Sequence, residues 1–343
     1  MIETIWIRGY HEIDFNRPNT YFVMGVRGAG KSSLLEALAL EHMERGAAVF
    51  DLFGSRDGEN LAWLRSPYTS KKRVLLLHGD GVKLNTKWET KPTSQLKLQD
   101  LEDYDIIISS SPLYVSPSQE FAEIGRLINS IYNRLSWKRM VYLLVREAAN
   151  LVYSRLALNE DQTTAKTEII YLLREARHMG VALGLDTLRF MSIDIDLRNN
   201  VDFLMLKAVG VLGLPDDLQW LYSFMDPHKL ATMPKQFFGV VTKEGDIGFG
   251  RFNAIPWHKQ EGEDILHQVD IEIVAKDETA IRPKQKFELS DEEIAKILEL
   301  HQQGYSLTRI SAILGRSRAT VDRILLKYAS PASAKTATPE KSQ

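Results

Sequence analysis

The feature that most constrains this chain is the run GVRGAGKS at residues 25–32, which fits the pattern G-x-x-x-x-G-K-[ST]. Its three glycines allow a tight turn in which successive backbone N–H groups point inward, at the positive end of the following helix. Such a loop binds phosphate when a strand precedes it and a helix follows it. The strand-like residues 21–24 and the helical pattern of residues 32–46 satisfy both conditions. The sequence therefore predicts a phosphate-binding loop between a strand and a helix.

The loop residues have distinct predicted roles. Lys31 would reach the β- and γ-phosphates of a nucleoside triphosphate, and the Ser32 hydroxyl would bind Mg²⁺. We therefore expect ATP and Mg²⁺ as cofactors. The predicted nucleotide-binding residues are Gly25, Gly28, Ala29, Gly30, Lys31, Ser32 and Ser33.

Short apolar runs rich in β-branched and aromatic residues recur along the chain and alternate with helical patterns. They predict strands at residues 21–25, 47–53, 73–78, 104–109, 140–145, 181–185 and 201–206. This alternation indicates an α/β fold with a mostly parallel sheet covered by helices on both faces. Residues 237–252 differ, because two strand patterns flank the turn residues 243–246 and predict a hairpin.

The length of 343 residues exceeds the size at which a single core usually stops growing, so a second folded unit is expected. We predict an α/β domain at 1–255, a charged and proline-interrupted linker at 256–288, a small all-α domain at 289–329 and a disordered tail at 330–343.

Composition excludes several classes of function. The chain has no cysteine, which excludes disulfides, thiolate metal sites and cysteine nucleophiles. Its net charge of -2 gives no overall attraction to nucleic acid, so any basic surface must be local. The sequence carries neither an apolar run of membrane-spanning length nor a signal-peptide pattern. We expect a soluble cytoplasmic protein with no membrane partner.

A second motif departs from the pattern of phosphate-loop ATPases, which have an apolar strand ending in Asp and then Glu. The best candidate is MVYLLVREAANLV at 140–152, where Glu147 fits the water-orienting role and Arg146 replaces the Asp of the Mg²⁺ shell. An arginine cannot coordinate Mg²⁺. Either another acid, Asp51 or Asp186, completes the shell, or hydrolysis is weak and the protein mainly binds nucleotide.

Five segments, in this order, resemble the HerA/FtsK superfamily of ring-forming ATPases that move DNA. They are the phosphate loop, VFDLFGSRDGEN, YLLVREAANLV, REARHMGVALGLDTLRF and DIDLRNNVDFLML, and the resemblance covers roughly residues 1–255. It implies a RecA/FtsK-like P-loop NTPase fold, a DNA-dependent ATPase activity and a ring, with six subunits as the expected number.

The resemblance also implies roles for single residues. Lys31 and Glu147 resemble catalytic residues, and Arg174 or Arg177 resembles an arginine finger that reaches a neighbouring subunit. Arg198 and Asn199 resemble the turn before the last strand. Leu188 replaces the glutamine that senses the γ-phosphate, so both Leu188 and Arg146 put efficient hydrolysis in doubt.

Residues 289–330 carry three helical patterns separated near Gly304 and Gly315. The last two patterns form a helix-turn-helix arrangement, similar to the DNA-binding ends of site-specific resolvases, whose second helix enters the major groove. Residues 282–328 have an excess of about three positive charges, which adds phosphate attraction. The predicted DNA-contacting residues are Arg316, Ser317, Arg318, Thr320 and Arg323.

These features predict an ATPase that moves or packages double-stranded DNA, of viral or mobile-element origin, in the cytoplasm or host cytoplasm. Two alternatives stay open. One is a nucleotide-dependent DNA-binding switch with weak or no hydrolysis, and the other is an ATPase whose C-terminal helices bind a protein partner.

Overall fold

The computed structural model divides into two units, Met1–Ile281 and Arg282–Gln343, which are described separately. The residues that the structure describes are 1–7, 12–53, 58–132, 139–153, 160–188, 193, 195–258, 265–280, 291–314, 321, 324–325 and 328.

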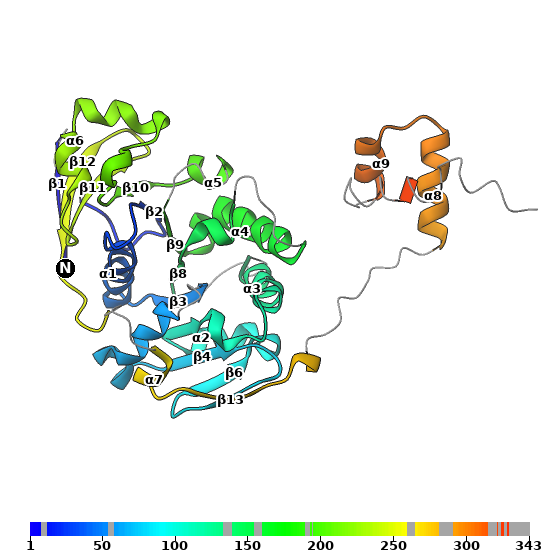
Figure 1. Ribbon diagram of the computed structural model, residues 1–343, viewed down its shortest axis with the longest axis horizontal. Helices are drawn as coiled ribbons and strands as arrows, with labels where there is room; N and C mark the ends of the chain where they lie inside the picture. Colours follow the sequence, from blue (N-terminus) through cyan, green and yellow to red (C-terminus); the bar gives the residue numbers. More distant parts are fainter. Residues whose placement is uncertain are drawn as a thin grey trace, which may run out of the picture. The chain divides into compact units, whose positions relative to one another are not determined.

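The described residues of the first unit form an 11-stranded sheet with the order β1-β12-β11-β10-β2-β9-β8-β3-β7-β4-β6 (Figure 1). All neighbours from β10 to β6 are parallel, and β11, β12 and β1 extend the sheet as antiparallel strands. The bounds are β1 Ile2–Trp6, β2 Thr20–Met24, β3 Ala48–Phe53, β4 Val74–His78, β6 Glu89–Pro92, β7 Ile106–Ser109, β8 Val141–Val145, β9 Val181–Thr187, β10 Phe203–Leu206, β11 Phe237–Thr242 and β12 Ile247–Phe252. The predicted mostly parallel α/β sheet is confirmed, as is the hairpin, which is β11 and β12.

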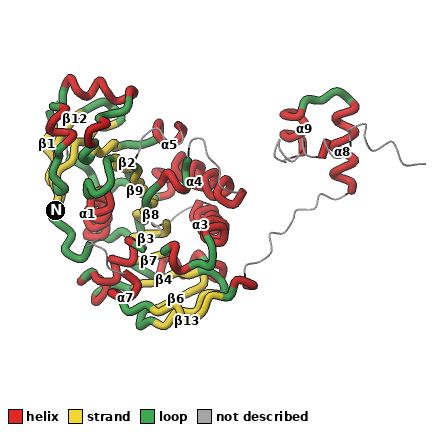
Figure 2. Tube along the Cα trace, viewed as in Figure 1, coloured by secondary structure: helices red, strands yellow, loops and turns green. Residues whose placement is uncertain are grey.

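Helices cover both faces of the sheet, as Figure 2 shows by colour. The α-helices of this unit are α1 Lys31–Glu44, α2 Leu98–Asp103, α3 Pro117–Tyr132, α4 Glu160–Met179, α5 Ile195–Asn199, α6 Pro227–Ala231 and α7 Ile265–Gln268. The 3₁₀ helices are η1 Glu59–Arg65, η2 Pro67–Ser70, η3 Thr93–Gln95, η4 Ser111–Leu113, η5 Ala148–Asn150, η7 Gly210–Leu212, η8 Asp216–Ser223 and η9 Glu278–Ala280.

The two faces follow from strand alternation, which points successive side chains to opposite sides. On β2, Tyr21 and Val23 pack in one core with Leu34 and Leu38 of α1. Phe22, between them, belongs to a second core formed with residues of α3 and α4, which lie side by side in Figure 1. Because both faces are buried, the central strands are mostly apolar, and this is the pattern that made them predictable.

The end of the first unit differs from the predicted linker at 256–288. In the structure, α7 lies in this range, and β13 Glu272–Lys276 pairs antiparallel with β5 Val82–Asn85. Ile265, Val269 and Ile271 are buried in the same core as α1. Few apolar residues are enough here because the segment packs onto a surface that the rest of the unit already provides, so it lacks the periodicity of an independent helix or strand.

The second unit contains α8 Asp291–Gln302 and α9 Leu307–Leu314. Its small core consists of Ile297, Leu300, Ile310, Val321 and Leu325. Gly304, with φ of 82°, follows α8 in the left-handed conformation that glycine adopts readily after a helix. None of the helices in the described part of either unit has the length and low polarity needed to cross a membrane.

Candidate nucleotide-binding site

The glycine-rich loop connects β2 to α1 at the carboxyl end of the parallel sheet. Gly28 and Gly30 have φ values of 76° and 86°, a region that side chains with a Cβ disfavour. Gly30 is also tightly packed, since a Cβ at this position would lie 2.9 Å from the Lys235 carbonyl oxygen. A Cβ at Gly25 would lie 2.7 Å from the Cβ of Lys207. Thus Gly28 serves the turn alone, whereas Gly30 also permits close packing behind the loop.

Lys31 is the first residue of α1 and is 8% exposed. Its ammonium nitrogen Nζ donates to the Val26 carbonyl across the loop, at 3.3 Å. Gly30 caps the 14-residue helix without a side chain, so the cap residue itself provides no side-chain acceptor for the N–H groups of the first turn. Ser32 and Ser33 are partly exposed there. Open N–H groups, a positive helix end and a lysine together suit a phosphate group.

Two acidic residues lie at the ends of the neighbouring strands. Asp186 is opposite Val23 in the pairing of β9 with β2, and its carboxylate accepts a hydrogen bond from the backbone N–H of Glu147. Burial raises the pKa of Asp186 to about 6, while the positive charge of Lys31 acts in the opposite direction. The Glu147 side chain is exposed and accepts a hydrogen bond from Asn150 Nδ2 at 3.0 Å. Lys31, Asp186 and Glu147 therefore gather at one edge of the sheet.

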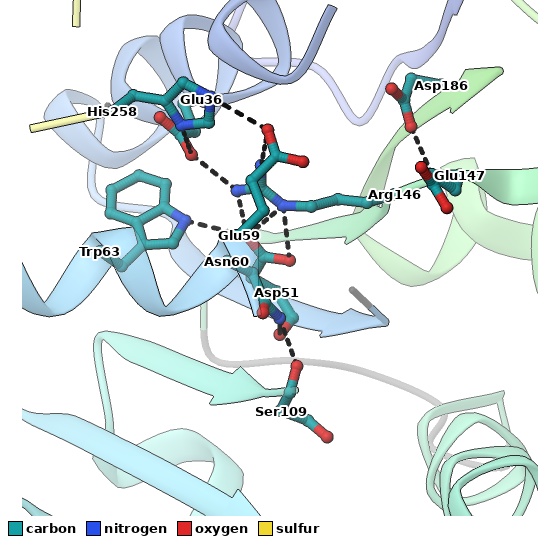
Figure 3. A network of polar contacts seen from close by, with 10 residues as sticks. All are labelled: Glu36, Asp51, Glu59, Asn60, Trp63, Ser109, Arg146, Glu147, Asp186 and His258. Carbon is teal, nitrogen blue, oxygen red and sulfur yellow. Dashed lines mark hydrogen bonds and ion pairs between the residues drawn. The ribbon is translucent and has the colours of Figure 1, made fainter. Parts of the chain in front are cut away.

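Arg146, at the position of the expected metal-binding Asp, is fully buried in a cluster of charged side chains (Figure 3). Its Nε and Nη2 atoms donate to Asp51 Oδ2 at 3.0 and 2.6 Å, and Nη2 also donates to Glu36 Oε1 at 2.7 Å. Glu59 Oε1 lies 3.7 Å from Nη1. Burial opposes the positive charge, but Asp51 and the other carboxylates raise the pKa of Arg146 well above its ordinary value.

His258, near the end of the first unit's sequence, also belongs to this cluster. Its Nδ1 lies 3.0 Å from Glu36 Oε1, and its Nε2 lies 3.0 Å from Glu59 Oε1. Burial acts against protonation, but the two glutamates raise the pKa of His258 to about 9. Burial likewise opposes ionisation of Glu59, yet His258 and Arg146 lower its pKa to about 2. At neutral pH Arg146, His258 and Glu59 are therefore charged, whereas burial raises the pKa of Asp51 against the effect of Arg146.

This geometry explains the departure at position 146. Arg146 is a buried structural cation that binds Asp51, and it faces carboxylates rather than the loop. Asp51 also accepts a hydrogen bond from Trp63 Nε1 at 2.9 Å, so both of its oxygens have protein partners. Because both oxygens already have partners, the geometry does not favour Asp51 as a metal ligand. Asp186, beside Lys31, is the better placed of the two acids considered from sequence.

The structure does not bring the predicted arginine fingers to the loop of their own chain. Arg177 is exposed on α4 and forms an ion pair with Asp202. Asp202 also accepts from the backbone N–H of Thr20, at the amino end of β2. Arg177 therefore lies at the edge of the sheet opposite the loop, and Arg174 is exposed one helical turn earlier.

The remaining predicted residues have varied positions. Leu188, directly after the last residue of β9, is 51% exposed. Arg198, near the end of α5, lies 3.3 Å from Asp217, and Asn199 is exposed. All five predicted DNA contacts lie outside the described part of the chain, namely Arg316, Ser317, Arg318, Thr320 and Arg323.

Sequence reasoning missed four residues of this region: Glu36, Glu59, Lys207 and His258. Glu36 had a signal, because it is a charge within the apolar run SLLEALAL. Lys207 directly follows β10 and is fully buried behind the loop, where Nζ donates to the carbonyls of Lys235 and Phe237. Burial lowers its pKa to about 7. His258 lay in the predicted linker, where no local pattern marked it.

A mostly parallel sheet with a glycine-rich loop between a strand and its following helix defines the P-loop NTPase fold, so the predicted fold class is confirmed. Residues 288–327 match the family model described as a helix-turn-helix domain, which confirms the predicted motif in the second unit. No curated protein sequence matches the chain.

Several solved structures are similar to this chain. The genome packaging NTPase B204 from Sulfolobus turreted icosahedral virus 2, in complex with ATP-gammaS, has 13% identity and a TM-score of 0.42 over 71% of this chain and 100% of that chain. The pCW3 conjugation coupling protein TcpA in monomer form with ATPgS has 12% identity and a TM-score of 0.43 over 78% and 69%. The cytoplasmic domain of the Thermomonospora curvata Type VII secretion ATPase EccC has 14% identity and a TM-score of 0.41 over 71% and 24%.

Proposed function

We propose that this chain is an ATPase that moves double-stranded DNA and works as a ring of subunits. The observation that carries the proposal is the presence, in one chain, of two features. The first is a phosphate loop with Lys31, Asp186 and Glu147 at the same sheet edge. The second is a helix-turn-helix domain. The first would bind and hydrolyse the nucleotide, and the second would bind the duplex.

Each residue at the edge has a chemical role in this proposal. Lys31 would bind the β- and γ-phosphates, and the Ser32 hydroxyl with a carboxylate such as Asp186 would hold Mg²⁺. The metal, when bound, neutralises phosphate charge. Glu147, exposed at the end of β8, would orient the attacking water, with Asn150 fixing its side chain.

Transition-state charge would be neutralised by an arginine from a neighbouring subunit. Arg174 and Arg177 are exposed on α4, as such a role requires. Arg177 would have to exchange its ion pair with Asp202 for the phosphate. We propose a ring because each site would take its arginine from the neighbouring subunit.

The alternative is a nucleotide-dependent DNA-binding switch that hydrolyses little ATP. Arg146 favours it, because a buried arginine occupies the position of the usual metal-binding acid. Leu188, which has no polar group to sense the γ-phosphate, favours it as well.

Steady-state ATP turnover with and without duplex DNA separates these functions. We expect turnover that DNA stimulates, abolished in Lys31→Ala and reduced about 100-fold or more in Glu147→Gln with ATP binding retained. Glu244→Gln, an exposed glutamate in the β11–β12 turn, is the matched control and should behave as wild type. Tight ATP binding without turnover would establish the switch instead. Turnover that ignores DNA, in a protein that does not bind DNA, would favour a protein partner for the second unit.

A further inference from the structure

We propose that Arg27, within the phosphate loop, contacts the γ-phosphate of the bound nucleotide and lets the site distinguish a triphosphate from a diphosphate. The inference rests on the proposed nucleotide site, and it deepens that site by adding a cation. The phosphate-loop pattern itself does not specify the residue at this position.

Arg27 lies in the middle of a tight turn. The Ala29 N–H donates to the Val26 carbonyl at 3.2 Å, and Gly28 within the turn has the left-handed φ of 76°. The Val26 N–H in turn donates to the Ala208 carbonyl, just after β10, at 2.8 Å. The turn that carries Arg27 is therefore held at its base by the segment that follows the neighbouring strand.

The contact of Lys31 shows which end of the site this turn occupies. Lys31 Nζ donates to the Val26 carbonyl at 3.3 Å, so the ammonium group lies against the peptide group that joins Val26 to Arg27. A lysine at this position of a phosphate loop reaches the β- and γ-phosphates. The terminal phosphate would thus lie near the residue that follows this peptide group, which is Arg27.

The Arg27 side chain is available for such a contact. It is exposed, and it makes no ion pair or hydrogen bond with any other residue that the structure describes. Arg146 and Arg177, by contrast, are both held by carboxylates. A guanidinium group offers several N–H donors in a planar arrangement that matches phosphate oxygens. Arg27 can therefore bind a phosphate without giving up a partner among these residues.

The charges at this edge of the sheet favour a further cation. Lys31 is accompanied there by the carboxylates of Asp186 and Glu147, so these three side chains together carry more negative than positive charge. Leu188, which directly follows β9, adds no charge. A triphosphate brings additional negative charge, which P-loop NTPases neutralise with cationic side chains as well as Mg²⁺. Arg27 would supply this positive charge from the loop itself.

The test compares the equilibrium affinities of ATPγS and ADP in the presence of Mg²⁺, so it does not depend on turnover. Arg27→Ala should weaken ATPγS binding about tenfold and ADP binding less than about twofold, because ADP lacks the phosphate that Arg27 contacts. Arg27→Lys keeps the charge and should recover part of the preference for ATPγS. Arg17→Ala is the matched control, because it removes an exposed arginine near the opposite end of β2, and both affinities should stay at the wild-type value.

The other possible results are distinct. An equal loss of affinity for ATPγS and ADP in Arg27→Ala would overturn the inference, since the arginine would then act on a part of the nucleotide that both ligands share. Wild-type affinities for both ligands in this variant would overturn it as well. If the wild-type protein binds neither ATPγS nor ADP, the proposed function itself is refuted, and this result is seen before any variant is compared.

Discussion

At the scale of single residues, the chemistry of Arg146 explains why this position accepts an arginine. The planar guanidinium offers several donors in a fixed arrangement, which allows it to bind Asp51 through two nitrogens and Glu36 through one. A lysine could not bind both carboxylates in this way. An aspartate here would place four carboxylates together in the interior, so restoring the acid alone would not restore a metal site.

Arg146→Met should therefore destabilise the protein severely. The substitution leaves three buried carboxylates without their main cation, and breaking a buried ion pair from one side costs about 3–5 kcal/mol. The free energy of unfolding, measured with urea, gives the cost.

Arg139→Met is the control for that measurement. Arg139 lies just before β8, and Arg146 lies just after it. Because the ion pair of Arg139 with Asp105 is partly exposed, we expect the free energy of unfolding to fall by at most about 1 kcal/mol. Equal losses in the two variants would show that the buried cluster has no special role in stability.

The same scale shows how far the sequence could predict the site. The phosphate-loop motif was enough to predict Lys31 and Ser32 as site residues, because their expected roles depend on neighbours within eight residues. The second motif, at residues 140–152, also showed that Arg146 departs from the expected acidic residue. It could not reveal the partners of Arg146, since Glu36 lies 110 positions away in the sequence and meets Arg146 only in the folded chain.

At the scale of elements, the apolar strands were predictable and the polar ones were not. β6 has the sequence ETKP and β13 is mostly exposed, so neither carries the apolar pattern of a buried strand. Each forms because a partner strand offers free backbone groups at an edge of its sheet. The segment around β13 was predicted as a linker because it lacks this apolar pattern. In the structure, the same segment also brings His258 to the charged cluster.

His258 should make the attachment of this segment dependent on pH. Its pKa is raised from 6.5 to about 9 in the folded protein, so its stabilisation is fully present below pH 6.5 and is lost as the pH rises to about 9. His258→Ala should therefore lower the free energy of unfolding most at pH 6 and little above pH 9. The loss should differ between these pH values by up to about 3 kcal/mol. Urea unfolding at pH 6, 7.5 and 9 measures it.

The comparison between variant and wild type is necessary because Lys207 acts in the opposite direction. Its folded pKa is lowered from 10.5 to about 7, so its contribution to stability increases between these values as the pH rises. The wild-type profile contains both effects, and subtraction isolates that of His258. His228→Ala, which removes an exposed histidine, should give a flat difference. A flat difference for His258→Ala as well would rule out its ionic role.

At the scale of the whole molecule, the chain joins an α/β unit that suits a nucleotide to a small helical unit that suits DNA. The net charge of -2 conceals the basic character of the second unit, so long-range attraction to DNA must come from a few side chains. Their number can be measured, because each phosphate contact releases counterions and makes binding more sensitive to salt.

The triple variant Arg316→Ala, Arg318→Ala, Arg323→Ala should bind duplex DNA more weakly and with less dependence on salt. The slope of log affinity against log salt should decrease by about 0.9 for each phosphate contact that is lost. ATPγS affinity should not change, since the nucleotide site lies in the other unit. Lys296→Ala, which removes a cation on α8 that is paired with Glu299, is the control and should leave the slope near its wild-type value. If the triple variant keeps the wild-type slope and affinity, the basic side chains of the second unit do not contact DNA phosphates, and a protein partner becomes the better explanation for this unit.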